Sequence, residues 1–140
     1  MQTAKAPETT ILVADDEAFM RSLVERTLQR SGYQVLLAED GDQALELAQS
    51  HPGEIKILLT DVRMPNMDGL CLAKKLRQIQ PEVRVILMSG YFDQSLQSHE
   101  GWTFIRKPFA ASMLQEIVRG ALDQPVAPLD DLSEANGWLS

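Results

Sequence analysis

The chain has 140 residues and a formal net charge of −7, and 44% of its residues are hydrophobic and 24% charged. This length and composition indicate one folded domain with a buried core. The acidic balance argues against a protein that binds nucleic-acid phosphates or an anionic membrane surface, because both need clustered Lys and Arg, and no run approaches the roughly 18 apolar residues that span a bilayer.

The first half of the chain alternates short apolar runs with helical patterns. Residues 1–9 predict a disordered leader. The run 11–14 predicts a strand that stops at Asp15-Asp16-Glu17, and an amphipathic helix follows until Gly32, which suits a left-handed C-cap. The rest of this half is predicted as a strand over 33–38, a turn at Asp40-Gly41 and a weaker helix broken by Pro52-Gly53.

The stretch from Ile57 to Gly69 is the one around which the chain is organised. A short apolar run stops at the carboxylate of Asp61, and turn residues follow at Pro65, Asn66, Asp68 and Gly69. Apolar runs of this length between turn residues predict a buried parallel strand. Ligands of open α/β sheets bind outside the carboxyl ends of the strands, so Asp61 is a candidate for chemistry.

The second half repeats the alternation. One predicted helix carries Leu72, Leu76 and Ile79, and residues 91–101 are only feebly helical. A last amphipathic helix carries apolar residues at helical spacing between Met113 and Leu122. Ala110 stands where a capping Ser, Thr or Asp would serve, a deficit of about 1 kcal/mol. Residues 124–140 predict a tail or linker. Strands are predicted over 83–88, ending at Ser89-Gly90, and over 102–105, ending at Arg106-Lys107-Pro108.

Five strands that alternate with helical segments predict an α/β domain over 10–123. Its fold class is a three-layer, doubly wound parallel sheet with right-handed crossovers. Parallel strands end at the same edge of such a sheet. The polar residues that follow four of the strands should therefore meet, namely Asp15-Asp16, Asp61, Ser89 and Lys107.

The charges of this group predict a metal ion. Three carboxylates within a few ångströms repel one another strongly unless cations answer them. Asp15, Asp16 and Asp61 contribute −3, a divalent ion +2 and Lys107 +1, which sums to zero. Oxygen ligands in an open, water-bearing site favour Mg²⁺. An aspartate forms an aspartyl-phosphate where a metal and a cation screen the phosphoryl oxygens, so we predict a Mg²⁺-dependent phosphoryl acceptor at Asp61, with Lys107 and Ser89 beside it.

Each of these residues has an ordinary structural role when it is taken alone. A lone Asp at a strand end is usually a turn or capping residue, the acids 15–17 would suit a helix N-terminus, and Lys107 would be a solvated charge. Their joint occurrence at neighbouring strand ends is the more specific signal. His51 and His99 are expected to be solvated, and Cys71 to be a small core or partner-facing residue.

The sequence resembles the receiver domain of two-component response regulators. The resemblance covers Thr10 to Leu122 and rests on four motifs in this order: V-A-D-D-E (13–17), L-L-T-D-V-R-M-P-N-M-D-G (58–69), I-L-M-S-G-Y (86–91) and F-I-R-K-P-F (104–109). The last two motifs are similar to those of receivers attached to hybrid sensor kinases. The resemblance implies a flavodoxin-like fold with the strand order 2-1-3-4-5.

The resemblance also implies roles for the acids and the lysine. Asp61 would be phosphorylated by a phosphohistidine on a histidine kinase or phosphotransfer protein. Asp16 and Asp61 would bind Mg²⁺ directly and Asp15 through water, while Arg63 would supply a backbone carbonyl. Lys107 would bind the phosphate, and many members of the family have a cis bond between this lysine and the next residue, here Pro108.

A switch is the last implied feature. By this resemblance, the phosphoryl group would draw the hydroxyl of Ser89 inward, and Phe104 would turn into the vacated space. Phe104 lacks the hydroxyl of the tyrosine that is common there. The segment from Ser89 to Lys107 is shorter than in most members, so we expect a shortened or absent fourth helix, with Trp102 and residues 91–101 rebuilding the output surface.

We therefore expect a cytoplasmic receiver that catalyses its own phosphorylation and slow dephosphorylation. A phosphorylation-independent interaction module with the same fold is the alternative. A haloacid-type phosphatase needs a second Asp two residues after the nucleophile, where Arg63 stands, and no glycine motif for dinucleotides or a P-loop occurs. The kinase, the downstream partner or fused domain, and homodimer formation are left open.

Overall fold

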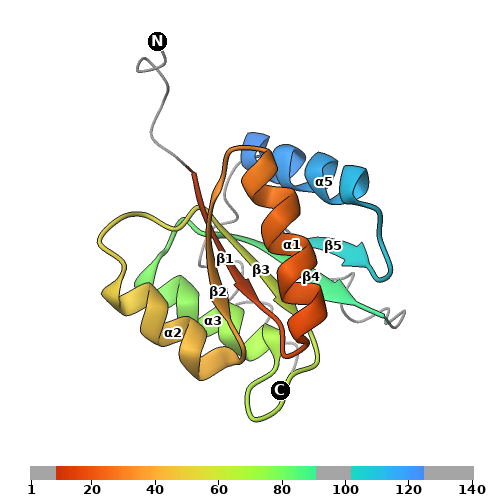
Figure 1. Cartoon of the computed structure of the whole chain (residues 1–140). Coiled ribbons are helices and arrows are strands. Elements are labelled where there is room, and N and C mark those ends of the chain that lie inside the picture. The colour runs from red at the N-terminus through yellow and green to blue at the C-terminus, as the bar shows by residue number, and fades with distance from the viewer. Residues whose placement is uncertain (1–8, 91–101, 125–140) are drawn as a thin grey trace.

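The computed structural model describes residues 9–90 and 102–124, which form one sheet with helices on both faces (Figure 1). Strands and helices alternate from residue 10 to residue 89 as the hydrophobic pattern predicts. In chain order the elements are β1 (Thr10–Ala14), α1 (Ala18–Arg30), β2 (Gln34–Ala38), α2 (Gly41–Ser50), β3 (Ile57–Asp61), α3 (Gly69–Ile79), β4 (Arg84–Ser89), β5 (Thr103–Arg106) and α5 (Ala111–Asp123).

The strands form one parallel sheet in the order β2-β1-β3-β4-β5. The predicted doubly wound, flavodoxin-like fold is therefore confirmed. The register places Ala14 beside Thr60, Asp61 beside Met88, and Ser89 beside Arg106. The carboxyl ends of β1, β3, β4 and β5 consequently lie along one edge of the sheet, where folds of this kind bind ligands.

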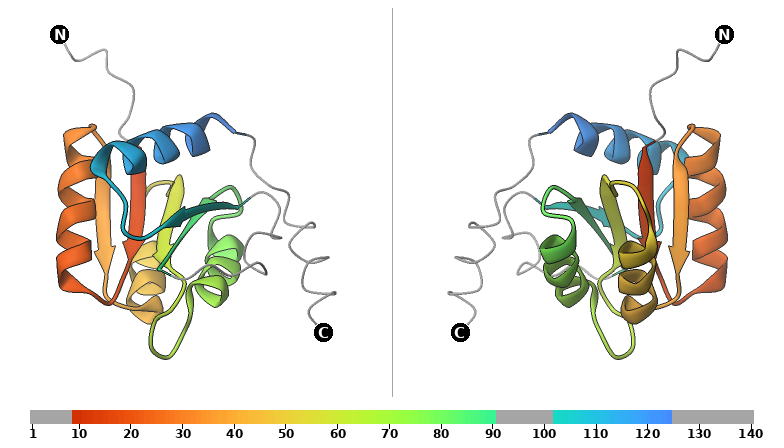
Figure 2. Two further views of the ribbon diagram at one scale, coloured as in Figure 1. Left: turned by 90° about the vertical axis from the view of Figure 1, so that its right-hand side faces the viewer. Right: turned by 90° about the vertical axis from the view of Figure 1, so that its left-hand side faces the viewer.

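The sheet separates two hydrophobic cores. On one side α2 and α3 pack together over a cluster that includes Leu12 and Leu58, and on the other side α1 and α5 cover a cluster that includes Ile11 and Leu59 (Figure 2). Because neighbouring residues of β1 and β3 face opposite cores, both strands are continuous apolar runs rather than alternating ones.

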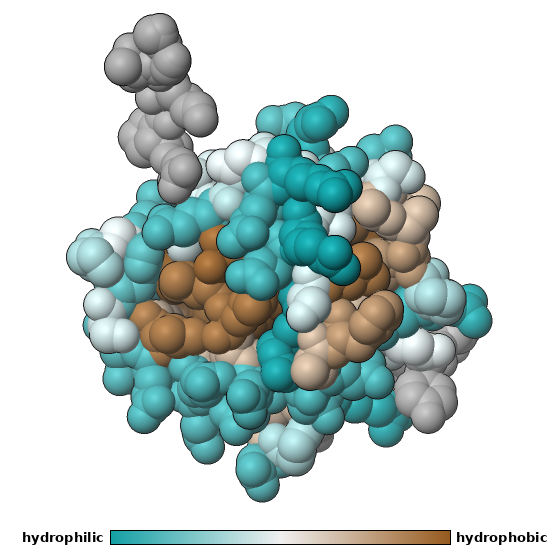
Figure 3. All heavy atoms as spheres, viewed as in Figure 1, coloured by the Kyte–Doolittle hydropathy of each residue, from teal (hydrophilic) through white to brown (hydrophobic). Residues whose placement is uncertain are grey.

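The strand β2 forms one edge of the sheet, beside α1 and α2. Its residues Val35, Leu36 and Leu37 are half-buried, and Figure 3 shows apolar side chains at the surface over this strand. On β4, which lies next to the opposite edge strand β5, Arg84 donates from Nε and Nη2 to the backbone oxygen of Gln124, at 3.1 and 3.0 Å. This pair of bonds ties the end of α5 to the start of β4.

One predicted detail is wrong. Asp40-Gly41 is not a free turn, because Asp40 is the N-cap of α2 and its Oδ1 accepts a hydrogen bond from the backbone N of Gln43 at 2.8 Å. The short Asp side chain that forms turns also caps helices, and the residues that follow decide between the two. Ser89 is the last residue of β4, so it ends this strand as the sequence predicts.

Other expectations concern the ends of elements and the chain outside them. Gly32 follows α1 with a φ of 92°, as the predicted left-handed cap requires. Three predictions concern residues outside the described part of the chain: the weak helix over 91–101, residues 1–8 of the leader and residues 125–140 of the tail. Within the described part, no helix combines the length and apolarity needed to cross a membrane.

The N-terminus of α5 gives a test of the predicted capping deficit. Ala110 has the extended backbone of an N-cap (φ −81°, ψ 155°) but makes no side-chain cap. Ala110→Ser should therefore raise the free energy of unfolding by about 1 kcal/mol, because the hydroxyl satisfies a free backbone N–H. Urea denaturation measures the change. The control Ala111→Ser, one residue into the helix, should not stabilise, and a gain no larger at 110 than at 111 would contradict the assignment.

Candidate functional site

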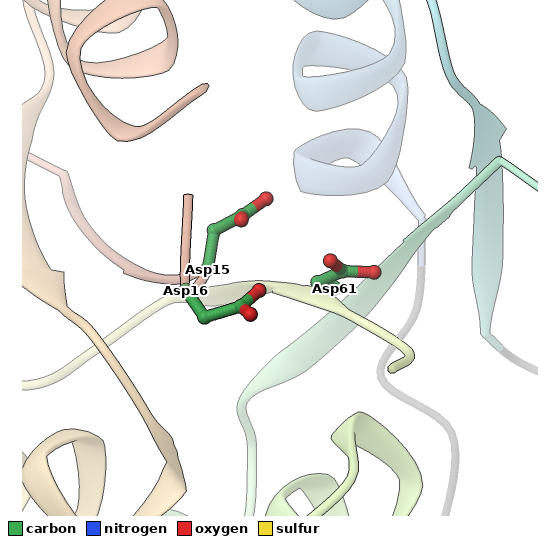
Figure 4. Close-up of side chains that lie close together, drawn as sticks. All are labelled: Asp15, Asp16 and Asp61. Atoms are coloured by element: carbon green, nitrogen blue, oxygen red, sulfur yellow. The ribbon is translucent and has the colours of Figure 1, made fainter. Parts of the chain in front are cut away.

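The polar residues predicted to meet do meet at the carboxyl edge of the sheet. Asp15 and Asp16 follow β1, and Asp61 is the last residue of β3. One carboxylate oxygen from each of the three lies within 4.8 Å of the others. Figure 4 shows the carboxylate of Asp16 pointing toward Asp61 across the ends of the two strands. This is the only group of three such ligands among the described residues.

Lys107 bridges two of the three acids. Its Nζ donates to Oδ2 of Asp15 at 2.9 Å and to Oδ2 of Asp61 at 3.2 Å, and Oε1 of Glu17 lies 4.0 Å away. The Lys107 side chain is 14% exposed and that of Asp61 13%, whereas Glu17 is at the rim with 67% exposed. The ammonium is therefore largely buried. Its charge interacts more strongly with the neighbouring carboxylates than it would on an exposed surface.

Asp15 is fully buried, and its carboxylate, its backbone N and its backbone oxygen all form hydrogen bonds. Its Oδ1 accepts from the backbone N of Glu17 at 2.8 Å, and its backbone N donates to the oxygen of Ala38 at 3.1 Å. Its own backbone oxygen accepts from Nη1 of Arg21 at 2.8 Å. Both carboxylate oxygens of Asp15 thus already have protein donors, which fits a residue that would reach a metal through water.

Arg21 was not identified from the sequence. A cation in the first turn of a helix is unfavourable for the helix dipole, and this was the signal that could have singled it out. In the structure Arg21 turns back to the strand end and donates to Asp15. It adds a positive charge next to the acid cluster.

The ionisation of Asp61 and Lys107 reflects this crowded, partly desolvated site. Burial raises the pKa of the Asp61 carboxyl above its ordinary value, and this outweighs the opposing attraction of Lys107. Burial alone would lower the pKa of Lys107, but its hydrogen bond to Asp15 and the charges of Asp15 and Asp61 raise it overall. Lys107 is therefore charged at neutral pH.

Ser89 and Phe104 lie on neighbouring strands close to this edge. Ser89 is buried at the end of β4, and its backbone oxygen accepts from the N of Lys107 at 2.8 Å. Phe104 pairs with Leu87 in the register of β4 and β5, and it is half-buried against the α2–α3 side of the sheet. The peptide bond between Lys107 and Pro108 is cis, as the resemblance implied.

The loop after β3 carries Arg63 past the acid cluster. The backbone N of Arg63 donates to Oδ1 of Asp61 at 3.3 Å, and the side chain is exposed. The loop closes where Gly69 N donates to the oxygen of Val62 at 2.8 Å. A methyl group at position 69 would collide with the backbone oxygen of Asp61, so only glycine lets α3 start this close to β3.

The donor set fits a hard divalent cation. The three carboxylates supply oxygen ligands of the kind that Mg²⁺ prefers, and neither a thiolate nor an imidazole belongs to the cluster. Asp16 is exposed and Asp61 is partly open, so both can offer an oxygen to an ion from solvent. Asp16 and Asp61 are therefore the residues suited to direct contact.

These features define a class of protein, namely a doubly wound α/β domain with a lysine-bridged acid pocket at the carboxyl edge of its sheet. Residues 11–119 match the sequence profile of the response regulator receiver domain. The chain belongs to this family, which works in two-component systems.

Three comparisons illustrate the relationship. The chemotaxis protein CheY of Bacillus subtilis is 34% identical over 118 residues, which are 81% of this chain and 97% of CheY. The sensor kinase CckA of Brucella abortus is 36% identical over 119 residues, 82% of this chain but only 13% of CckA. The crystal structure of the receiver domain from the hybrid histidine kinase CckA has a TM-score of 0.72 at 38% identity, and the match covers 81% of this chain and 99% of that one.

The raised pKa of Asp61 predicts a pH-dependent effect on stability. The folded state holds this proton above pH 3.8, the ordinary value, where the unfolded chain has lost it, so stability falls as pH rises through the shifted pKa. Asp61→Asn cannot ionise and should unfold at a higher urea concentration than the wild type at pH 7 without divalent cations. The difference should shrink as pH falls below 3.8.

The control for this prediction is Asp42→Asn, which changes an exposed acid in the first turn of α2. It removes one negative charge without touching the acid cluster, so it should bring no such gain. Equal stability of wild type and Asp61→Asn at pH 7 would show that burial does not destabilise the Asp61 carboxylate.

Proposed function

We propose that this chain is a phosphoacceptor switch, phosphorylated on Asp61 by a phosphohistidine of a histidine kinase or phosphotransfer protein. The observation that carries the proposal is the bridge of Lys107 between Asp15 and Asp61, with Asp16 alongside. A buried structural ion pair needs one acid for one base, whereas three acids around one lysine leave negative charge for a cation to answer. We take the receiver unit to be 10–123.

Phosphorylation follows from the chemistry of these groups. An oxygen of Asp61 attacks phosphorus, the P–N bond to the donor histidine breaks, and its electron pair stays on the imidazole nitrogen. Lys107 is in place to move from the Asp61 carboxylate to a phosphoryl oxygen while it keeps its bond to Asp15. A bound Mg²⁺, held by Asp16, Asp61 and the Arg63 carbonyl, would supply charge neutralisation at the phosphoryl oxygens.

The reverse reaction sets the lifetime of the signal. Water attacks the phosphorus of the acyl phosphate, the bond between phosphorus and the Asp61 oxygen breaks, and inorganic phosphate leaves with the carboxylate restored. The same residues that screen the phosphoryl group in the forward step screen it here, so the domain acts on itself rather than on a metabolite.

Signal output would pass through Ser89 and Phe104. Ser89 can donate its hydroxyl to a phosphoryl oxygen, and the register of β4 and β5 sets Phe104 two residues from the partner of Ser89. A shift of Ser89 toward Asp61 leaves space on the side of the sheet where Phe104 packs. The phosphorylated population would then present a changed surface to a downstream partner.

A small phosphodonor tests the acceptor. Acetyl phosphate with Mg²⁺ should add one phosphoryl group to the wild type, seen by intact-protein mass spectrometry, and none to Asp61→Asn, which has no nucleophilic carboxylate. Lys107→Ala should lower the rate by about a hundredfold or more, because the developing charge loses its cation. Asp42→Asn should react like the wild type, and modification of Asp61→Asn at the wild-type level would end the proposal.

Tryptophan emission tests the switch. Trp102 packs on the same core as Phe104, so in a Trp138→Phe background its fluorescence should change when beryllofluoride and Mg²⁺ occupy the acceptor site. Ser89→Ala should still bind beryllofluoride but lose most of the change, because the hydroxyl that draws β4 inward is gone. Ser22→Ala, on the exposed face of α1, is the control.

The alternative function is a phosphorylation-independent interaction module with a receiver fold. Measuring how tightly a partner binds distinguishes this module from the phosphoacceptor switch. Binding of a cognate partner that is equal for wild type, beryllofluoride-bound wild type and Asp61→Asn would favour the module. We also propose that the protein acts in the cytoplasm.

A further inference from the structure

A close contact joins the N-terminus of α2 to the loop that follows the acceptor aspartate. Gly41 and Met67 are both buried, and Met67 is 8% exposed. A methyl group at position 41 would lie 2.5 Å from Sδ of Met67 and 3.0 Å from both its Cβ and its Cγ. The contact with the sulfur is too short to persist, and because both residues are buried the Met67 side chain has little room to swing aside, so an added methyl group would press on the loop that carries Met67.

Backbone hydrogen bonds also hold this loop, which runs from Val62 to Gly69. Its base is closed by the bond from Gly69 N to Val62 O, and Val62 N donates to the oxygen of Met88 at 2.9 Å. Near its tip Met67 N donates to Pro65 O at 2.8 Å, and Asn66 has a φ of 72°. The loop is thus held at its base by the sheet and α3, and at its tip by Met67 against α2.

We propose that the contact of Gly41 with Met67 is a positioning device for the metal site. It holds the loop that carries Arg63, whose backbone N donates to Oδ1 of Asp61 at 3.3 Å. It acts only through this loop, since neither Gly41 nor Met67 belongs to the acid cluster. The proposal rests on the phosphoacceptor function above. It assigns to α2, an element with no residue in the acid cluster, control over the affinity of the site for Mg²⁺.

Asp40 supports the proposal from the other side. Its Oδ1 caps α2 through Gln43 N at 2.8 Å, and Glu39 N donates to Oε1 of Gln43 at 2.6 Å. These bonds fix where α2 begins, so Gly41 cannot retreat from a larger side chain without loss of the cap. The strain of an added methyl group therefore passes to Met67 and the loop.

The experiment measures Mg²⁺ affinity in protein that is still folded. Gly41→Ala should raise the Mg²⁺ dissociation constant about tenfold by isothermal titration calorimetry, as changes behind metal ligands commonly do. The matched control is Gly120→Ala on α5, where a methyl group meets nothing within 4 Å among the described residues. It should leave the Mg²⁺ affinity at the wild-type value, and equal affinities for the two variants overturn the proposal.

A double-mutant cycle separates positioning from a general loss of packing. Met67→Ala removes the sulfur, which is the nearest atom at 2.5 Å, and also Cγ, so in this background Gly41→Ala should change the dissociation constant by less than about twofold. An equal effect in both backgrounds overturns the proposal. If Gly41→Ala alone does not fold, recovery of folding by Met67→Ala supports the contact, and failure to recover refutes it.

The wild type distinguishes this inference from the function on which it rests. If the wild type neither binds Mg²⁺ nor accepts a phosphoryl group, the phosphoacceptor proposal fails. If the wild type does both and Gly41→Ala behaves like Gly120→Ala, only the positioning device fails.

Discussion

The arrangement of this domain depends on the ammonium of Lys107 between the carboxylates of Asp15 and Asp61. The three groups come from three strands, β5, β1 and β3, and the last two are direct neighbours in the sheet. Removing the lysine would leave Asp15 as a fully buried charge, which is costly in a protein interior. In the proposed function, the same contact that stabilises the fold would also supply the cation that a phosphoryl group needs.

Much of the fold could be predicted because buried parallel strands have a simple sequence pattern. Continuous apolar runs that end at acids or at Lys107 gave the strands and their shared edge within a residue or two. The sheet order 2-1-3-4-5 came from the family resemblance, since hydrophobic runs alone do not say which strands are neighbours. Asp40 was misread because turn and cap use the same side-chain oxygen, and only the start of the next helix separates them.

The site was predicted less completely than the fold. Asp15, Asp16, Asp61, Ser89 and Lys107 follow from their places after strands, whereas their roles beyond the observed geometry stay predictions. Arg21 and the pair Gly41–Met67 were missed because their contacts join elements far apart in the sequence. Arg77, fully buried on α3, shows the same limit, since arginine is ordinarily a surface residue.

The two-sided burial of the sheet has a consequence for how the chain finds its alignment. When both faces of a strand are apolar, a shift of β3 along β1 exchanges one aliphatic contact for another, so packing alone discriminates poorly between neighbouring alignments. The carboxylates at the strand ends do discriminate, because any shift inward drags Asp61 into the hydrocarbon interior. The charged residues at the strand ends thus help to fix the register of the strands.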